Sequence, residues 1–387
     1  MVAPSRCRRT AVKAVVAGAG VAGLATGIAL RQAGFEVEIF ERAPELREIG
    51  AGLMIWPNGE RALRALGVAV NALTVRRLSV CTWRGRQINQ YPLDAIAERY
   101  GLAPSFVHRA DLQAALAARF GFDGLTFDAD VSGFTQDGAA VELTLRNRKT
   151  IAGDFLVGAD GLRSTVRQGL LGDGDPVYLG STIWRGILHA DGMGVPASTG
   201  INWVGRGSEF LVFQLRGERL YWAAVTKELA GERMGAAGHR GDLMKRFGDW
   251  VQPVPRLIEA TDEAAILRND MYDRPTTRRW SRGRVTLVGD AAHPMTPNAG
   301  QGACQALEDA VALGHVLTQT NDPAVAFRLY ERRRVRRVNR VVAMSRQATR
   351  AVQIDNPFLC ALRDGVAYPL AERLFLRTLD GILAPDE

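Results

Sequence analysis

The chain has 387 residues, of which 47% are hydrophobic and 23% charged, so it is long enough to bury a large core and form two domains. Its four cysteines form no CxxC pair and its five histidines form no HxxxH cluster, which argues against a disulfide framework and a zinc site and predicts a reducing cytoplasm. The net charge of +8 raises the possibility of nucleic-acid binding, but residues 332–340 read as one solvated face of an amphipathic helix without interleaved aromatics. We therefore expect the positive charge to attract anionic cofactors or substrates.

Residues 12–42, VKAVVAGAGVAGLATGIALRQAGFEVEIFER, predict a strand, a glycine-rich turn, a helix and a second strand. Gly18, Gly20 and Gly23 have the GxGxxG spacing that lets a pyrophosphate approach the backbone at a helix N-terminus. Glu41 ends the second strand roughly twenty residues later, where an acidic residue binds a ribose hydroxyl. A secretory signal is the alternative for this uncharged stretch, but a signal needs no such glycines. The segment predicts a dinucleotide site without saying which dinucleotide binds.

Two later segments each show an apolar strand that runs into glycine and aspartate. Residues 155–167, FLVGADGLRSTVR, reach Asp160, and residues 284–313, RVTLVGDAAHPMTPNAGQGACQALEDAVAL, reach Asp290. Asp290 is placed to accept a hydrogen bond from a ribose or ribityl hydroxyl at the end of a buried sheet. The glycines that follow it let a planar ligand approach a helix N-terminus, which favours negative charge. A flavin ring meets both conditions.

Together the three ordered segments resemble the class A flavoprotein monooxygenases, the family of p-hydroxybenzoate hydroxylase, over most of the chain. The stretch from Arg268 to Leu313 is most similar to the short single-domain enzymes that act on salicylate, 3-hydroxybenzoate, urate and zeaxanthin. The resemblance implies that the first motif holds the ADP half of FAD, that the motif at Asp160 lies near the pyrophosphate and is linked to nicotinamide cofactor use, and that Asp290 binds the ribityl chain. Transferred position by position, it gives as cofactor-binding residues Gly18, Gly20, Gly23, Glu41, Arg42, Arg47, Met54, Arg109, Val131, Asp160, Asp290, Pro297, Gly300, Gln301 and Gly302.

Residues 76–102 and 178–269 read as short alternating strands with polar turns, so we expect an antiparallel sheet that covers the flavin. In the enzymes that the chain resembles, this sheet forms the substrate pocket. The urate-type members have an arginine about where this chain has Ser208–Phe210, which disfavours urate. Aromatic candidates for the pocket lining, each equally suited to the core, are Trp184, Trp203, Phe213 and Tyr221.

Three residues are candidates for a direct part in catalysis. Pro297 matches the loop beside the isoalloxazine ring, and Tyr221 and His293 are the candidate bases for a phenolic substrate. A loop-packing role with a neutral ring bonded to the backbone is the alternative for His293. For the lone arginines, a solvated or structural role is the alternative.

The expected fold class is α/β, with a Rossmann-like FAD-binding domain interleaved with an antiparallel-sheet substrate domain and followed by C-terminal helices. The expected boundaries are 1–75, 103–177 and 270–345 for the FAD-binding domain, 76–102 and 178–269 for the substrate domain, and 346–387 for the C-terminal helical segment. The C-terminal segment is expected to pack on the body of the fold, and no segment has the character of a membrane span.

The resemblance implies an FAD-dependent monooxygenase that consumes NADPH or NADH and O₂ and hydroxylates, or epoxidises, a planar aromatic or other electron-rich small molecule through a flavin hydroperoxide. It further implies a cytoplasmic monomer or homodimer without a nucleic-acid partner or integral membrane association. The enzyme alternatives are a flavin-dependent reductase or dehydrogenase acting on an isoprenoid-like molecule without oxygen insertion, and a plain nicotinamide dehydrogenase. A flavin-binding protein without turnover is the alternative from another class.

Overall fold

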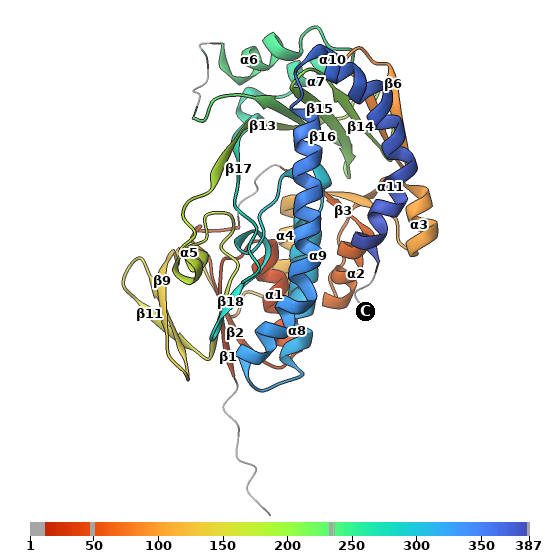
Figure 1. Ribbon diagram of the computed structural model, residues 1–387. Helices are drawn as coiled ribbons and strands as arrows, with labels where there is room; N and C mark the ends of the chain where they lie inside the picture. Colours follow the sequence, from red (N-terminus) through yellow and green to blue (C-terminus); the bar gives the residue numbers. More distant parts are fainter. Residues whose placement is uncertain (1–11, 47–50, 232–234, 236, 385–387) are drawn as a thin grey trace, which may run out of the picture.

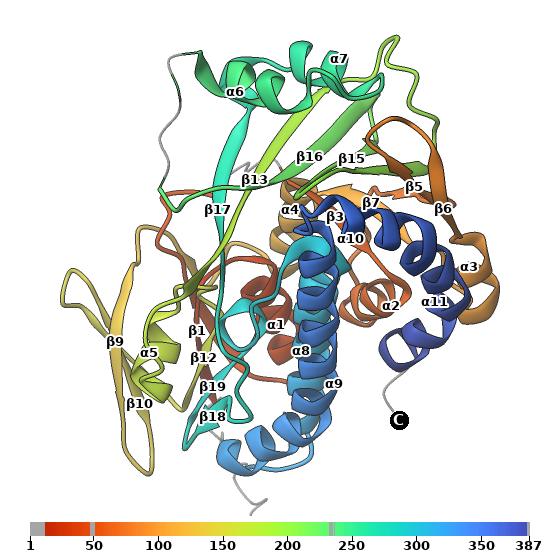
Figure 2. The same ribbon diagram turned by 45° about the horizontal axis from the view of Figure 1, so that its top comes forward.

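The computed structural model describes residues 12–46, 51–231, 235 and 237–384, which contain two large β-sheets. The first sheet lies in the lower half of Figure 1 and is flanked by helices, whereas the second lies in the upper half. The turned view in Figure 2 places the second sheet above the upper ends of these helices. Both sheets are assembled from strands that lie far apart in the sequence.

The first sheet is a Rossmann-like sheet whose neighbouring strands are parallel except at one edge, where the first two strands are antiparallel. Its central strands are buried on both faces, which explains their unbroken apolar runs. Because the strands are parallel, their carboxyl ends and the turns that follow them meet at one edge. The strand order is β18 (Ser281–Arg282), β19 (Val285–Leu287), β12 (Phe155–Gly158), β1 (Lys13–Ala17), β2 (Glu36–Phe40) and β8 (Leu125–Thr126).

Helices pack closely beside the first sheet because small residues line their contacts. A Cβ atom on Gly314 would lie 2.9 Å from the Cβ of Ala29, so the two helices that carry these residues approach each other closely. The helices of this layer are α1 (Val21–Gln32), α2 (Pro57–Leu66), α4 (Arg109–Phe120), α5 (Thr165–Leu171), α8 (Gly302–Leu317) and α9 (Pro323–Val352).

The second sheet is mostly antiparallel and has two differently covered faces. Its outer face packs against α6 (Gly238–Phe247) and α7 (Val254–Glu259). Its inner face carries Ile183, Ile187, Leu211, Phe213, Tyr221 and Ala223 and packs toward the first half of the molecule. The strand order is β17 (Leu267–Asp273), β13 (Val177–His189), β16 (Arg219–Lys227), β15 (Ser208–Leu215), β14 (Thr199–Val204), β5 (Arg77–Thr82) and β6 (Gln87–Pro92).

Two three-stranded sheets and several short elements complete the described chain. One small sheet contains β3 (Gly52–Ile55), β7 (Ser105–His108) and β4 (Leu73–Thr74), and the other contains β11 (Thr150–Gly153), β10 (Val141–Leu145) and β9 (Val131–Gln136). The remaining elements are α3 (Asp94–Tyr100), η1 (Glu263–Ala265), η2 (Gly289–Ala291), η3 (Pro297–Ala299), α10 (Pro357–Leu362), η4 (Arg363–Ala367) and α11 (Tyr368–Leu383).

The C-terminal helices α10 and α11 lie along one side of the molecule and bury only part of their apolar surface (Figure 1). Leu379, Ile382 and Leu383 pack into the core with the inner face of the second sheet. Other large apolar side chains of these helices are exposed, so the expectation that the segment packs on the body holds for one face only. No helix of the described chain is long and apolar enough to cross a membrane. The exposed apolar residues are Phe358, Leu359, Leu362, Leu370 and Leu374 on the two helices and Val366 on η4 between them.

The expected α/β fold with C-terminal helices is confirmed, with one correction to the second sheet. β14 and β5 are parallel, because the chain leaves the sheet after β6 and returns to it only at β13. The sheet is therefore mixed rather than antiparallel. The domain boundaries stay a prediction.

Candidate functional site

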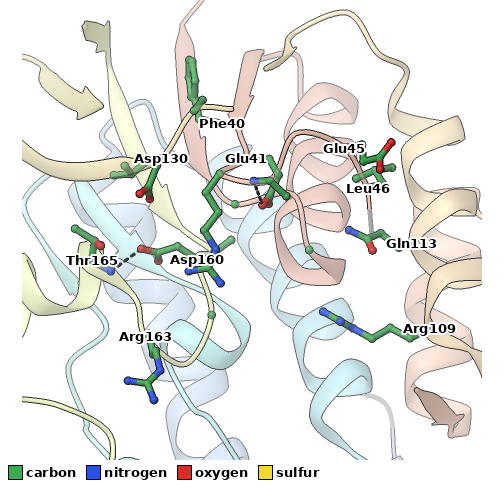
Figure 3. Close-up of a pocket in the computed structure, with 18 residues that line it drawn as sticks. Phe40, Glu41, Glu45, Leu46, Arg109, Gln113, Asp130, Asp160, Arg163 and Thr165 are labelled. Atoms are coloured by element: carbon green, nitrogen blue, oxygen red, sulfur yellow. Dashed lines mark hydrogen bonds between the residues drawn. The ribbon is translucent and has the colours of Figure 1, made fainter. Parts of the chain in front are cut away.

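A cavity of about 430 Å³ opens where β1, β2 and β12 end (Figure 3). The glycine turn between β1 and α1 forms part of its wall, and Arg109 extends into it from the start of α4. No described residue forms an ion pair with the Arg109 guanidinium, so its charge is available to an anionic ligand. The predicted cofactor-binding residues that line this cavity are Gly18, Gly20, Glu41, Arg42, Arg109, Val131 and Asp160.

The carboxylate of Glu41 shapes the glycine turn at the cavity wall. The backbone N–H of Ala19 donates to one carboxylate oxygen at 2.8 Å, and that of Ala43 donates to the other at 2.9 Å. Gln113, which was not predicted, supports the turn by donating from Nε2 to the Ala19 carbonyl at 2.8 Å. The protein's own hydrogen bonds thus hold the turn from two sides, and Glu41 has acceptor capacity left for a ribose hydroxyl.

Asp160 lies in the same wall, but its carboxylate caps α5. It accepts hydrogen bonds from the backbone N–H groups of Thr165 at 2.7 Å and Val166 at 3.1 Å, and from the Ser164 hydroxyl. Burial raises the pKa of Asp160, and these hydrogen bonds partly oppose that effect. Since most of its acceptor capacity is used within the protein, Asp160 shapes the turn beside the cavity.

The second aspartate motif presents a carboxylate with no protein partner. Gly289 adopts φ +57, and its N–H donates to buried Asp309 at 3.0 Å, which fixes the turn that carries Asp290. No described residue donates a hydrogen bond to Asp290, whose side chain is exposed. Nearby protein atoms nevertheless remove part of its water, which raises its pKa, while the charges of His293 and Arg109 oppose that rise. A hydroxyl-rich ligand chain is a suitable partner for such a carboxylate.

The loop before α8 provides a surface for a planar ligand. Gly300 has φ +60, and a Cβ atom there would lie 3.1 Å from Trp56 Nε1 and 3.2 Å from Met54 Cβ. Gln301 is buried and accepts hydrogen bonds from Asn58 and Gln305, both at 3.0 Å. No described side chain caps α8 at its start, so the first-turn N–H groups remain available to a ligand.

These features fit FAD. The glycine turn and Arg109 suit a pyrophosphate, the unpartnered Asp290 suits a ribityl hydroxyl, and the loop at Gly300 suits the ring. Met54 lies beside Gly300, Gly23 supports the turn from α1, and Pro297 begins η3. Arg47 lies outside the described residues.

The predicted pocket residues divide between the two faces of the second sheet. Phe213 and Tyr221 lie on the inner face, where the Phe106 ring is 4.3 Å from Phe213 and 5.6 Å from Tyr221 between centroids. Trp184 and Trp203 lie instead on the outer face in the core beneath α6 and α7. This placement does not support a pocket role for the two tryptophans, because strand alternation turns them away from the cofactor loop.

The surroundings of the two candidate bases do not favour proton abstraction. Burial raises the pKa of Tyr221 to about 12, so its hydroxyl keeps its proton at neutral pH and can donate a hydrogen bond. His293 is buried with Nε2 2.5 Å from the carboxylate of Asp309, which also pairs with Arg334 at 2.9 Å. The partner of His293 is therefore a buried carboxylate rather than the expected backbone, and this network supports the turn at Asp290.

Sequence reasoning missed a polar group on the inner face. Glu209 is buried and accepts hydrogen bonds from Asn202 at 3.0 Å and from Asn298 of the cofactor loop at 2.7 Å. Burial raises the pKa of Glu209, against the smaller effect of these two donors. Arg185, also missed, lies on the same face as Tyr221. Both residues could have been found from strand alternation, because each lies two positions from apolar residues that face the same side of the sheet.

Replacing Asp290 by alanine is expected to weaken FAD binding by about 10- to 100-fold, because a hydrogen bond to a charged group contributes about 1.5–3 kcal/mol. The melting temperature of the apoprotein should stay unchanged, since no described residue depends on this carboxylate. Fluorescence titration of the apoprotein with FAD measures the affinity. Asp249→Ala, at an exposed aspartate beyond α6, is the matched control. Equal FAD affinity in both variants would contradict the assignment.

Comparison with known proteins agrees with this geometry. A family model described as FAD binding domain matches residues 11–173 and 261–345. Aurachin C monooxygenase/isomerase of Stigmatella aurantiaca is 38% identical over 363 residues, covering 92% of this chain and 94% of that protein. FAD-dependent urate hydroxylase of Klebsiella pneumoniae is 34% identical over 342 residues, covering 87% and 89%. The crystal structure of Klebsiella pneumoniae HpxO complexed with FAD and uric acid has a TM-score of 0.90 at 32% identity, covering 96% of this chain and 97% of that one.

These matches confirm the expected family and its cofactor, FAD. The cavity at the glycine turn and the carboxylate of Asp290 fit this cofactor. The chain belongs to the FAD-binding-domain family and, within it, to the FAD-dependent monooxygenases.

Proposed function

We propose that the chain uses NADPH or NADH and O₂ to insert one oxygen atom into a planar, electron-rich small molecule held between the inner face of the second sheet and the loop from Pro297 to Gly302. The observation that carries the proposal is the aromatic cluster of Phe106, Phe213 and Tyr221, which lies against β3. A Cβ atom on Gly52 of β3 would lie 2.7 Å from Tyr221 Cδ1. The three side chains are almost fully buried, so a flat organic ring that reaches them enters an apolar environment with little water.

When bound, FAD supplies the activation of O₂, which no amino-acid side chain provides. The protein's own residues bind and orient the substrate and exclude water from it. The apolar side chains of the inner face keep water from the reacting ring. The Tyr221 hydroxyl, protonated at neutral pH, donates a hydrogen bond that orients a substrate oxygen. The free N–H groups at the start of α8 favour negative charge beside the loop.

The relatives' names support a small-molecule substrate without specifying one. They include aurachin C monooxygenase/isomerase, urate hydroxylase and zeaxanthin epoxidase. The segment Ser208–Phe210 stands about where the urate-type enzymes are expected to have an arginine, and the carboxyl of Glu209 in this segment is already bonded to Asn202 and Asn298. We therefore propose a substrate other than urate. Cytoplasmic location and a monomeric or homodimeric state stay predictions.

The test is oxygen-dependent turnover by the FAD-loaded protein. NADPH and NADH are each supplied with a panel of planar aromatic compounds, and NAD(P)H oxidation, O₂ uptake and transfer of ¹⁸O from labelled O₂ to product are measured. At least one compound should stimulate oxidation and gain one labelled atom. Tyr221→Phe should lower product formed per NAD(P)H consumed, whereas Trp203→Phe, on the outer face, should not. Substrate conversion without labelled oxygen would favour the reductase alternative, and no conversion across the panel would favour a binding protein.

A further inference from the structure

Arg185 is a half-buried cation on the inner face of the second sheet. It lies on β13 between Ile183 and Ile187, which pack toward the cofactor loop, so alternation places Arg185 on the same face. Its cross-strand neighbour on β16 is Ala223, whose small side chain leaves room beside the guanidinium. Tyr221 is close enough for its ionisation to be coupled to the charge of Arg185.

The guanidinium of Arg185 has no carboxylate partner in the described chain. One of its terminal nitrogens donates to the neutral side chain of Asn269, and its Nε is buried without any hydrogen-bond partner. By contrast, buried Arg167 and Arg274 both pair with Asp173, at 2.5 and 3.1 Å. Burial lowers the pKa of Arg185 and the charge of Arg109 adds to this, whereas only an ionised Tyr221 would oppose it. The charge of Arg185 is therefore uncompensated on the inner face of the second sheet.

A cation that loses water without gaining a counter-charge destabilises the folded chain unless a ligand supplies that charge. Glu209 does not supply it. Glu209 lies on β15, with β16 between it and β13, and both of its oxygens accept hydrogen bonds from asparagines. The unused Nε and terminal N–H groups of Arg185 form the planar donor set that recognises a carboxylate or a similar oxyanion.

We propose that Arg185 binds an anionic oxygen group of the planar substrate, so that the enzyme selects aromatic acids over uncharged aromatic compounds of the same shape. The inference rests on the proposed function, because it takes the substrate to lie against the inner face. Both carboxylates and ionised ring hydroxyls are anionic oxygen groups. A pH titration distinguishes them, because a carboxyl group ionises at a much lower pH than a ring hydroxyl.

The test compares 2-naphthoate with 2-naphthamide as probes of the full-length, FAD-loaded protein. Binding is followed through the change in flavin absorbance. We expect the acid to bind at least tenfold more tightly than the amide, with a preference that weakens as salt is added. 2-Naphthol measured at pH 7 and pH 10 tests the ionised hydroxyl in the same way.

Variants assign the preference to one side chain. Arg185→Met should weaken 2-naphthoate binding at least tenfold and change 2-naphthamide binding less than twofold, and Arg185→Lys should retain an intermediate preference. Arg206→Gln, at an exposed arginine in the turn between β14 and β15, is the matched control and should bind both probes like the wild type. If Arg185→Met does not retain FAD, the wild-type acid-to-amide ratio and the Arg185→Lys variant decide the question.

Equal binding of acid and amide by the wild type, or an equal loss of both in Arg185→Met, would overturn the proposal. Failure of the proposed function has a different signature. If the acid is preferred through Arg185 but no compound in the panel gains an oxygen atom from O₂, the anion site stands and the monooxygenase proposal fails. If oxygen insertion occurs without preference for acids, the monooxygenase proposal stands and the Arg185 site fails.

Discussion

Replacing Gly23 by alanine is expected to destabilise the protein by about 3 kcal/mol and to prevent stable FAD binding. A Cβ atom at this position would lie 1.8 Å from the carbonyl oxygen of Gly18 and 2.9 Å from its carbonyl carbon. Both atoms belong to the backbone of the cofactor turn, so the clash is relieved only by moving α1 away from β1 or by distorting the turn. Thermal unfolding of the apoprotein and the ratio of bound FAD to protein measure the two effects.

Gly20→Ala is the matched variant that separates folding from binding. A Cβ atom on Gly20 has no neighbour within 4 Å, and the backbone angles there, φ −72 and ψ −175, suit any residue. We expect the stability of the apoprotein to change by about 1 kcal/mol or less, whereas FAD affinity should fall by at least about tenfold because the new methyl group stands where the pyrophosphate approaches. A stable Gly23→Ala variant that retains FAD, or a Gly20→Ala variant with unchanged FAD affinity, would contradict this account of the turn.

The cofactor side of the site could be predicted because its residues belong to local motifs. A strand, a turn and a helix of set lengths bring Gly18 and Gly23 together, and Glu41 follows within the same unit. Asp290 was predicted in the same way, from the strand that precedes it, and its contact with FAD stays a prediction. Asp160 was predicted to lie near the pyrophosphate, and it does line the cavity at the glycine turn, although its hydrogen bonds to the first turn of α5 were not foreseen.

The substrate side was predicted less well because strand alternation gives two faces without saying which one is inner. Trp184 was predicted to line the pocket because it is a large aromatic residue. It lies on the outer face, which α6 and α7 cover, and the adjacent Arg185 lies on the inner face. Which face becomes the inner one depends on packing between segments that lie far apart in the sequence. The same holds for His293, whose partner Asp309 lies on α8 and is itself paired with Arg334 on α9.

Arg334→Met is expected to destabilise the protein by about 3–5 kcal/mol, the usual cost of leaving a buried charge without its partner. Arg334 is buried on α9 and pairs with buried Asp309 at 2.9 Å, and it also donates to the Gln305 side chain at 2.8 Å. Urea unfolding at neutral pH measures the loss. Arg333→Met, at the exposed neighbouring position, should change stability by about 0.5 kcal/mol or less.

The pH dependence of unfolding tests the same buried network. Burial alone would raise the pKa of Asp309, but the charges of His293 and Arg334 outweigh it and the pKa lies below its ordinary value. A carboxyl group with a lowered pKa in the folded state stabilises the protein above its unfolded value of about 3.9, and that stability is lost as the pH falls through the folded value.

Arg334→Met removes one of the two charges that lower this pKa, so Asp309 should take up a proton at a higher pH in the variant and stability should fall earlier on acidification. Asp309 also accepts the N–H of Gly289, so FAD affinity should fall together with stability. Identical pH profiles for Arg334→Met and wild type would show that the ion pair does not set the charge of Asp309. Unchanged FAD affinity in Arg334→Met would show that the buried network does not hold the turn that presents Asp290.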